Sequence, residues 1–200
     1  MEDNGIKIWR IVLTGGPCGG KTTAQNRLAT FFESLGWRVF RVPETATILL
    51  NGGISFGLLT DSQRFEFQTN LLKTMLQLED TYFSLARTQT RNCLVICDRG
   101  AMDCSAYLPR EDWELIMEQN HYNEVDLRDN RYHQVIHLVT AAKGAEEHYT
   151  RSNNSARSED LAMAIKNDVL VGDAWVGHPY YEGVICVNRS KLLNLFTVSD

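Results

Sequence analysis

The sequence has no excess of basic residues, few cysteines and no long hydrophobic run. Its 20 Lys and Arg residues are outnumbered by 25 Asp and Glu, which leaves a formal net charge of −5. No cluster of Lys or Arg stands out along the chain. Binding to nucleic acid or to an anionic membrane through net charge is therefore not expected.

The cysteines and the apolar stretches exclude further classes of protein. Five cysteines are an odd number, and none forms a Cys-x-x-Cys pair, which argues against a disulfide framework and a zinc site. The acidic opening MEDNGIKIWR does not resemble a signal peptide. The longest uncharged stretch, Thr45 to Thr60, has 16 residues and is too short to span a bilayer as a helix. We expect a reduced, cytoplasmic protein without a membrane span.

Length and patterning predict one α/β domain. The 200 residues suit one domain with or without an appendage, and 44% apolar and 22% charged residues are typical of a globular protein. Short β-branched segments alternate with longer amphipathic ones, which is the pattern of a parallel sheet covered by helices on both faces. We expect strands at residues 7–14, 37–42, 93–98, 133–140 and 182–187, and helices at about 21–36, 61–92, 110–120 and 158–171.

A glycine-rich segment between the first strand and the first helix carries the most specific signal. It matches G-x-x-x-x-G-K-[ST], the pattern of a phosphate-binding loop, in the strand–loop–helix context that this loop requires. Lys21 is expected to contact the β- and γ-phosphates, and the Thr22 hydroxyl to bind Mg²⁺. The flanking strand and helix argue against a chance match. The residues of the segment are Gly15, Gly16, Pro17, Cys18, Gly19, Gly20, Lys21 and Thr22.

Acidic and basic residues follow two other predicted strands. Asp98 ends the apolar run Leu94–Cys97, where a carboxylate beside a phosphate loop can hold Mg²⁺. Arg99 and Asp103 should lie at the same edge of the sheet, where ligands of open α/β sheets bind. Glu44 follows the second strand and could act as a base or hold metal-bound water. A solvated strand-end Asp98, and a Glu44 that only stabilises a helix dipole, are the alternatives.

The polar stretch 143–160 suggests a lid over the ligand. Its two arginines, Arg151 and Arg157, could neutralise charge on a transferring phosphoryl group. A solvated loop with Ser158 capping the next helix is the alternative. His133 and His137 are expected to be structural, because residues four apart in a strand lie about 13 Å apart.

Several segments together resemble one known family. TGGPCGGKTT, RVPETA, LVICDRGAMDCSAY, NRYHQVIHLVTAA, SNNSARSE and AWVGHPY are similar, in this order, to the NadR/TRPL-translocation-defect type of P-loop domain, which is AAA-like and nucleoside-kinase-like. The metazoan TRPL translocation defect proteins are the most similar branch. The resemblance covers roughly residues 8 to 181.

The resemblance implies a three-layer P-loop NTPase fold and assigns residues by position. Residues 15 to 23, Thr23 included, correspond to the phosphate loop, Asp98 and Arg99 to a DRG element, and Glu44 to a strand-end acid. Arg157 corresponds to the lid arginine of an NNxxRxE pattern, whereas Arg151 lies outside that pattern. Bacterial relatives include nicotinamide riboside kinase domains, and the animal members are regarded as nucleotide-binding trafficking proteins.

The carboxyl-terminal end departs from the family. The animal proteins carry a CYTH-like domain after this one, which we do not expect here, and GVICVNRSKLLNLFTVSD stands where the resemblance implies a strand that ends in an acid and an amide, followed by a helix. We therefore expect residues 1–187 to form the nucleotide-binding domain, with its lid at about 143–160, and residues 188–200 to form a divergent or truncated tail. Lipid binding is not expected of this chain alone.

Three functions fit the sequence. The first is a regulatory protein of trafficking or signalling that binds ATP or GTP with Mg²⁺, hydrolyses it slowly or not at all, and has room for a protein partner. The second is a kinase for a small, nucleoside-like alcohol, with Glu44 or Asp98 as the base and Arg99 and Asp103 orienting the acceptor. In both, Lys21 and Arg157 would stabilise charge on the phosphates. The third is an isoform that folds poorly.

Overall fold

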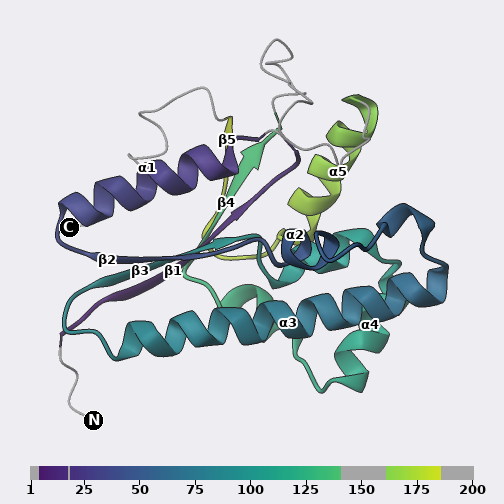
Figure 1. Cartoon of the computed structure of the whole chain (residues 1–200), viewed down its shortest axis with the longest axis horizontal. Coiled ribbons are helices and arrows are strands. Elements are labelled where there is room, and N and C mark those ends of the chain that lie inside the picture. The colour runs from purple at the N-terminus through teal and green to yellow at the C-terminus, as the bar shows by residue number, and fades with distance from the viewer. Residues whose placement is uncertain (1–4, 18, 141–160, 186–200) are drawn as a thin grey trace.

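Five parallel strands form the centre of the molecule. The computed structural model describes residues 5–17, 19–140 and 161–185 (Figure 1). The strands run in the order β2-β3-β1-β4-β5, and every neighbouring pair is parallel. This confirms the predicted α/β fold. The strands are β1 (Ile8–Thr14), β2 (Arg38–Val42), β3 (Cys93–Asp98), β4 (Gln134–Val139) and β5 (Tyr181–Ile185).

Helices connect the strands. The four predicted helices are present with shifted ends: α1 (Lys21–Ser34), α3 (Asp61–Arg87), α4 (Arg110–Gln119) and α5 (Leu161–Ala174). Four short segments were not predicted, because each is too short to show a helical repeat. They are α2 (Thr45–Leu50), the 3₁₀ segments η1 (Phe56–Leu58) and η2 (Ala101–Tyr107), and the single π-turn η3 (Asp126–Asn130). No helix in the described part of the chain is long and apolar enough to cross a membrane.

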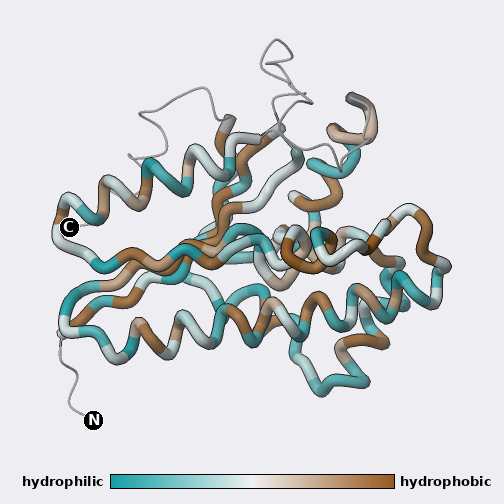
Figure 2. Tube along the Cα trace, in the orientation of Figure 1, coloured by the Kyte–Doolittle hydropathy of each residue, from teal (hydrophilic) through white to brown (hydrophobic). Residues whose placement is uncertain are grey.

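Successive strand residues point to opposite faces of the sheet. Ile11 and Leu13 pack in the cluster that includes α1, whereas Val12 packs in the cluster with α3 and α4. All three are fully buried. Figure 1 shows α1 on one side of the sheet and α3 with α4 on the other, and Figure 2 shows apolar residues concentrated along the strands between them. Both faces of the sheet are therefore covered, which leaves the strand ends as the place for a ligand.

A buried ion pair between Glu79 and Arg131 links α3 to the segment that follows β3. The Arg131 guanidinium lies 2.5 Å from Oε2 of Glu79, whose side chain is fully buried. The Tyr132 hydroxyl donates to Glu79 and accepts the N–H of Ala101, which belongs to the segment directly after β3. Burial raises the pKa of Glu79, and the charge and hydrogen bonds of Arg131 and Tyr132 oppose that rise. This network fixes the backbone just beyond Asp98.

We expect Arg131→Met to lower the free energy of unfolding by about 3–5 kcal/mol at pH 8, because it leaves the buried Glu79 carboxylate unpaired. Without Arg131 the folded-state pKa of Glu79 rises further above its unfolded value. Stability is then retained at low pH and lost as pH rises through the folded pKa, so the deficit at pH 5 should be smaller. Urea unfolding at both pH values measures this. Arg110→Met breaks an exposed pair with Glu114 and should cost less than about 1 kcal/mol; equal losses for the two variants would contradict the assignment.

Candidate functional site

The loop between β1 and α1 packs against the backbone at the end of β4. A Cβ atom on Gly15, whose φ is +125°, would lie 2.1 Å from the carbonyl oxygen of Leu138. A Cβ atom on Gly19 would lie 2.5 Å from the same oxygen. Only glycine allows this approach, so the sequence pattern reports a packing requirement as well as a conformational one. Cys18, within the same loop, lies outside the described residues.

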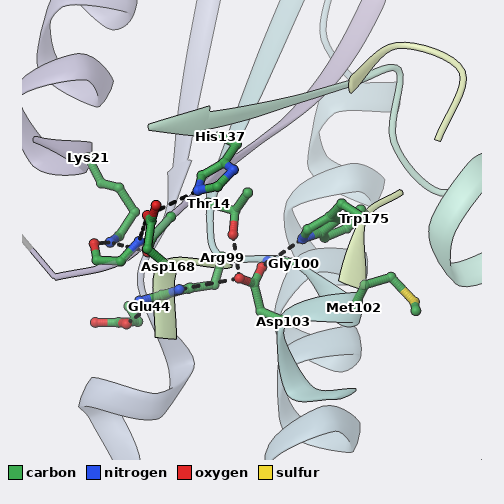
Figure 3. Close-up of polar contacts among 12 residues, drawn as sticks. Thr14, Lys21, Glu44, Arg99, Gly100, Met102, Asp103, His137, Asp168 and Trp175 are labelled. Carbon is green, nitrogen blue, oxygen red and sulfur yellow. Dashed lines mark hydrogen bonds and ion pairs between the residues drawn. The ribbon is translucent and has the colours of Figure 1, made fainter. Parts of the chain in front are cut away.

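Lys21 folds back over this loop. It is the first residue of α1, and its ammonium group donates to the carbonyl oxygens of Gly15 at 3.0 Å and Gly16 at 2.9 Å (Figure 3). Thr22 and Thr23, the next two residues of the helix, are exposed. The loop therefore carries a lysine above it and leads into a helix N-terminus that includes two threonines, and these groups are the donors that phosphate requires.

Asp98 lies beside this loop with one oxygen buried and unsatisfied. It ends β3 opposite Leu13 of β1, and its Oδ1 has no hydrogen-bond partner among the described residues. Burial raises the pKa of Asp98, and the positive charge of Lys21 opposes the rise. A buried carboxylate oxygen without a partner fits a ligand of Mg²⁺, directly or through water.

The protein would supply few ligands to such an ion. No group of three or more His, Cys, Asp or Glu side chains in the described ranges could hold a metal by itself. Mg²⁺ at a phosphate loop takes most of its ligands from water and phosphate oxygens, so one carboxylate and one hydroxyl are sufficient. Asp98 and Thr22 fit that requirement.

Arg99 joins the two other predicted acids. Its backbone has φ +74°, which is uncommon for a residue other than glycine, and its side chain is buried. Its guanidinium lies 3.2 Å from Glu44 and 3.3 Å from Asp103 (Figure 3). Burial alone would lower the pKa of Arg99, but the surrounding negative groups keep it above its ordinary value. The three residues thus form one ion-pair cluster, at the edge of the sheet where the sequence placed them.

Asp103 is held by several donors. Its carboxylate accepts hydrogen bonds from the Thr14 hydroxyl, the Gly100 N–H at 2.8 Å and the Trp175 ring N–H at 3.3 Å, besides the contact with Arg99. These partners come from β1, from the segment after β3 and from the residue directly after α5. Asp103 therefore joins three elements beneath the site, and its orientation is fixed.

Glu44 is the N-cap residue of α2, but its side chain does not cap the helix. One carboxylate oxygen accepts from Arg99, and the other accepts the hydroxyl hydrogen of Thr47. Glu44 is partly buried and also lines a cavity. It can therefore face a ligand while Arg99 holds it in place.

A cavity of about 520 Å³ lies next to the phosphate loop. Most of its lining is apolar, with polar groups from the cluster around Arg99 and from α3. One of them, Gln68, is 3% exposed, and its Oε1 has no hydrogen-bond partner in the described part of the chain. The lining includes Pro17, Glu44, Phe56, Phe67, Gln68, Arg99, Asp103, Tyr107, Met163 and Asn167.

Two residues near the site, Gln68 and Asp168, are not indicated by the sequence pattern. Gln68 stands inside a long amphipathic helix, where nothing in the pattern separates it from surface polar residues. Asp168 of α5 bonds to Gly16 and to His137, a histidine expected to be structural. Residues 143–160 with Arg151 and Arg157, and the tail 188–200, lie outside the described residues.

Comparisons with known proteins agree with this geometry. The family model described as "AAA domain" matches residues 10–190, which includes the phosphate loop, Asp98 and the cavity. No curated protein matches the chain.

The close approach of the loop to β4 makes a steric prediction. Gly15→Ala should lower the free energy of unfolding by about 2 kcal/mol more than Gly36→Ala, because overpacking adds to the backbone strain. Gly36 has φ +83°, but a Cβ there meets nothing within 4 Å, so it controls for strain alone. Chemical denaturation of both variants measures the difference, and equal losses would show that the loop does not need this contact.

Proposed function

The chain belongs to the AAA domain family and is a nucleotide-binding P-loop NTPase domain, and we propose that its ligand is ATP or GTP with Mg²⁺. The glycine loop packed under Lys21 is the observation that carries the proposal. Gly15 and Gly19 lie against the Leu138 carbonyl, so the loop backbone packs on the carboxyl end of β4. The ammonium group of Lys21 contacts the same loop. This arrangement supports the binding of a phosphate chain.

Each residue of the site would then have a defined task. When nucleotide binds, Lys21 would exchange its hydrogen bonds to the Gly15 and Gly16 carbonyls for hydrogen bonds to phosphate oxygens. The exchange leaves the number of its hydrogen bonds unchanged. The Thr22 hydroxyl and Asp98 hold Mg²⁺, which would supply charge neutralisation between the phosphates. Arg157, by its position in the resemblance, would reach the triphosphate from the segment 143–160. Gly16, Pro17, Cys18, Gly20 and Thr23 complete the proposed nucleotide contacts.

We further propose a regulatory role with slow or no hydrolysis. No glutamine for positioning an attacking water is indicated by the sequence, and Gln68 lines the adjoining cavity. The family resemblance adds intracellular trafficking or signalling as the setting, with a protein partner that responds to the bound nucleotide. A cytoplasmic location belongs to the same proposal.

We expect Lys21→Ala to abolish the thermal stabilisation of the protein by Mg²⁺-ATP and Mg²⁺-GTP, because the loop loses its only lysine. Wild-type protein at about 100 times Kd should gain about 2.7 kcal/mol. Lys73→Ala, at an exposed position of α3, is the control and should retain the full shift. A shift that persists in Lys21→Ala would overturn the assignment of this loop.

A second candidate function, a small-molecule kinase, is favoured by the cavity. It adjoins the phosphate loop at Pro17 and the charged cluster at Glu44 and Asp103, so an acceptor in it would face the transferring phosphate. Glu44 or Asp98 would take the proton of an acceptor hydroxyl, whose oxygen bonds to the γ-phosphorus as the bond from that phosphorus to the β,γ-bridging oxygen breaks and the nucleoside diphosphate leaves.

The lining of the cavity indicates the class of acceptor. Phe56 and Phe67 lie with ring centroids 5.6 Å apart, and both border the cavity, which suits a ring. The unsatisfied Oε1 of Gln68 would accept an N–H or O–H of that ring, which removes a cost of about 1–3 kcal/mol. Glu44 and Asp103 outweigh the single charge of Arg99, so a neutral or cationic alcohol is favoured over an anion.

If the cavity holds an acceptor, Gln68→Leu should raise the acceptor KM while nucleotide affinity stays unchanged. Glu44→Gln should leave nucleotide affinity nearly intact and remove acceptor-dependent turnover if Glu44 is the base. The assay measures the release of ADP or GDP in the presence of a panel of nucleosides and related ring alcohols. Turnover that no alcohol stimulates in the wild type would leave nucleotide binding as the function and would contradict the kinase.

A further inference from the structure

Asp168 on α5 is bonded directly to the phosphate loop. Its Oδ1 accepts the N–H of Gly16 at 2.7 Å and the N–H of Thr140, at the end of β4, at 3.1 Å. The residue is 2% exposed. Burial alone would raise the pKa of Asp168, but the hydrogen bonds from His137, Gly16 and Thr140 together lower it. Asp168 is therefore a buried carboxylate whose partners include the loop itself.

Two further side chains hold this carboxylate in place. The Nε2 atom of His137 lies 3.0 Å from Asp168 Oδ1, and its Nδ1 lies 2.6 Å from the Tyr181 hydroxyl (Figure 3 shows the first contact). With Nε2–H donating to Asp168, Nδ1 accepts the hydrogen of Tyr181. Gly172 packs on the ring, since a Cβ there would lie 2.8 Å from His137 Cε1. A series of hydrogen bonds thus connects Tyr181 of β5, His137 of β4 and Asp168 of α5 to the loop.

The surrounding contacts leave little room for Asp168 to move. A Cβ on Gly16 would lie 3.0 Å from the Asp168 Cβ, so backbone and side chain are in close contact. The Thr140 hydroxyl donates to the Pro17 carbonyl at 2.6 Å, on the other side of the same turn. The start of the loop is therefore held at two successive residues, Gly16 by Asp168 and Pro17 by Thr140. Lys21 contacts the loop from α1.

We propose that Asp168 is a positioning residue that holds the phosphate loop in its binding conformation, supported by His137 and Tyr181. The proposal rests on the proposed nucleotide binding. A loop that is already ordered loses less conformational entropy when phosphate binds, so its affinity is higher. Removal of Asp168 takes away the acceptor of the buried Gly16 N–H, and the loop rearranges to satisfy that group.

The same helix reaches the other parts of the site. Asn167 and Met163 line the cavity, and Trp175 donates to Asp103. Asp168 thus links the loop to a helix that also borders the cavity and that leads directly into Trp175, a partner of Asp103. A change at Asp168 should therefore act on the ligand site rather than on the fold alone.

The test compares the affinity of four proteins for Mg²⁺-ATP and Mg²⁺-GTP by calorimetry, at a temperature where all are folded. Asp168→Ala should weaken binding of the preferred nucleotide by at least ~10-fold, about 1.4 kcal/mol. Asp168→Asn keeps an oxygen for Gly16 and should recover part of the affinity. Asp173→Ala changes an exposed acid of the same helix and should bind as the wild type does.

Tyr181→Phe is a milder variant should Asp168→Ala fail to fold. It removes only the hydroxyl that holds His137 and should weaken binding about threefold, on the scale of one lost hydrogen bond. In the double variant with Asp168→Ala the two losses should not add, because both act through one chain of contacts. Additive losses would contradict the proposal that Tyr181 acts through His137 and Asp168.

Hydrogen exchange without nucleotide separates the two proposals. Asp168→Ala should lose protection at the Gly16 and Thr140 amides, while Asp173→Ala keeps it. A folded wild type that binds no nucleotide would overturn the proposed function. Wild-type binding together with an Asp168→Ala variant whose affinity and amide protection are unchanged would overturn the positioning role alone.

Discussion

The contact of the glycine loop with the Leu138 carbonyl is the constraint on which the site depends. Gly15 and Gly19 approach that oxygen so closely that no side chain fits at either position. Because β1 and β4 are neighbours in the sheet, the loop after β1 is pressed against the end of β4. This contact places Lys21 at the start of α1 over the loop, and it brings Asp168 and Thr140 within reach of its first residues.

The charged residues that follow β2 and β3 have different contacts. Arg99 is bonded to Glu44 and Asp103, so these acids are oriented and neutralised in part. Asp98 has a buried oxygen that no described residue satisfies. In the proposed site Asp98 is thus the acid with an oxygen left for a metal ion, whereas Glu44 and Asp103 are held by Arg99, and Glu44 also lines the neighbouring cavity.

The sequence predicted those parts of the site that rest on local pattern. The motif from Gly15 to Thr22 and the strand-end positions of Asp98 and Glu44 follow from strand–loop–helix order, because parallel strands end at one edge. The match of the AAA domain family supports the P-loop fold, and the NadR/TRPL type stays a prediction. The contacts of His137 and Asp168 could not be predicted, because their partners lie on other elements far along the chain, and nothing in the pattern of α3 separates Gln68 from surface polar residues. The short helix α2 was missed because a single turn and a half carries no periodicity.

The most direct test of the central claim is the thermal stability of the wild-type chain with ATP, GTP, ADP and GDP, each with and without Mg²⁺. We expect a Mg²⁺-dependent rise in the unfolding temperature with at least one triphosphate, and the strongest ligand would identify the preferred base. A protein that melts cooperatively and shifts with none of the four would contradict a working phosphate site.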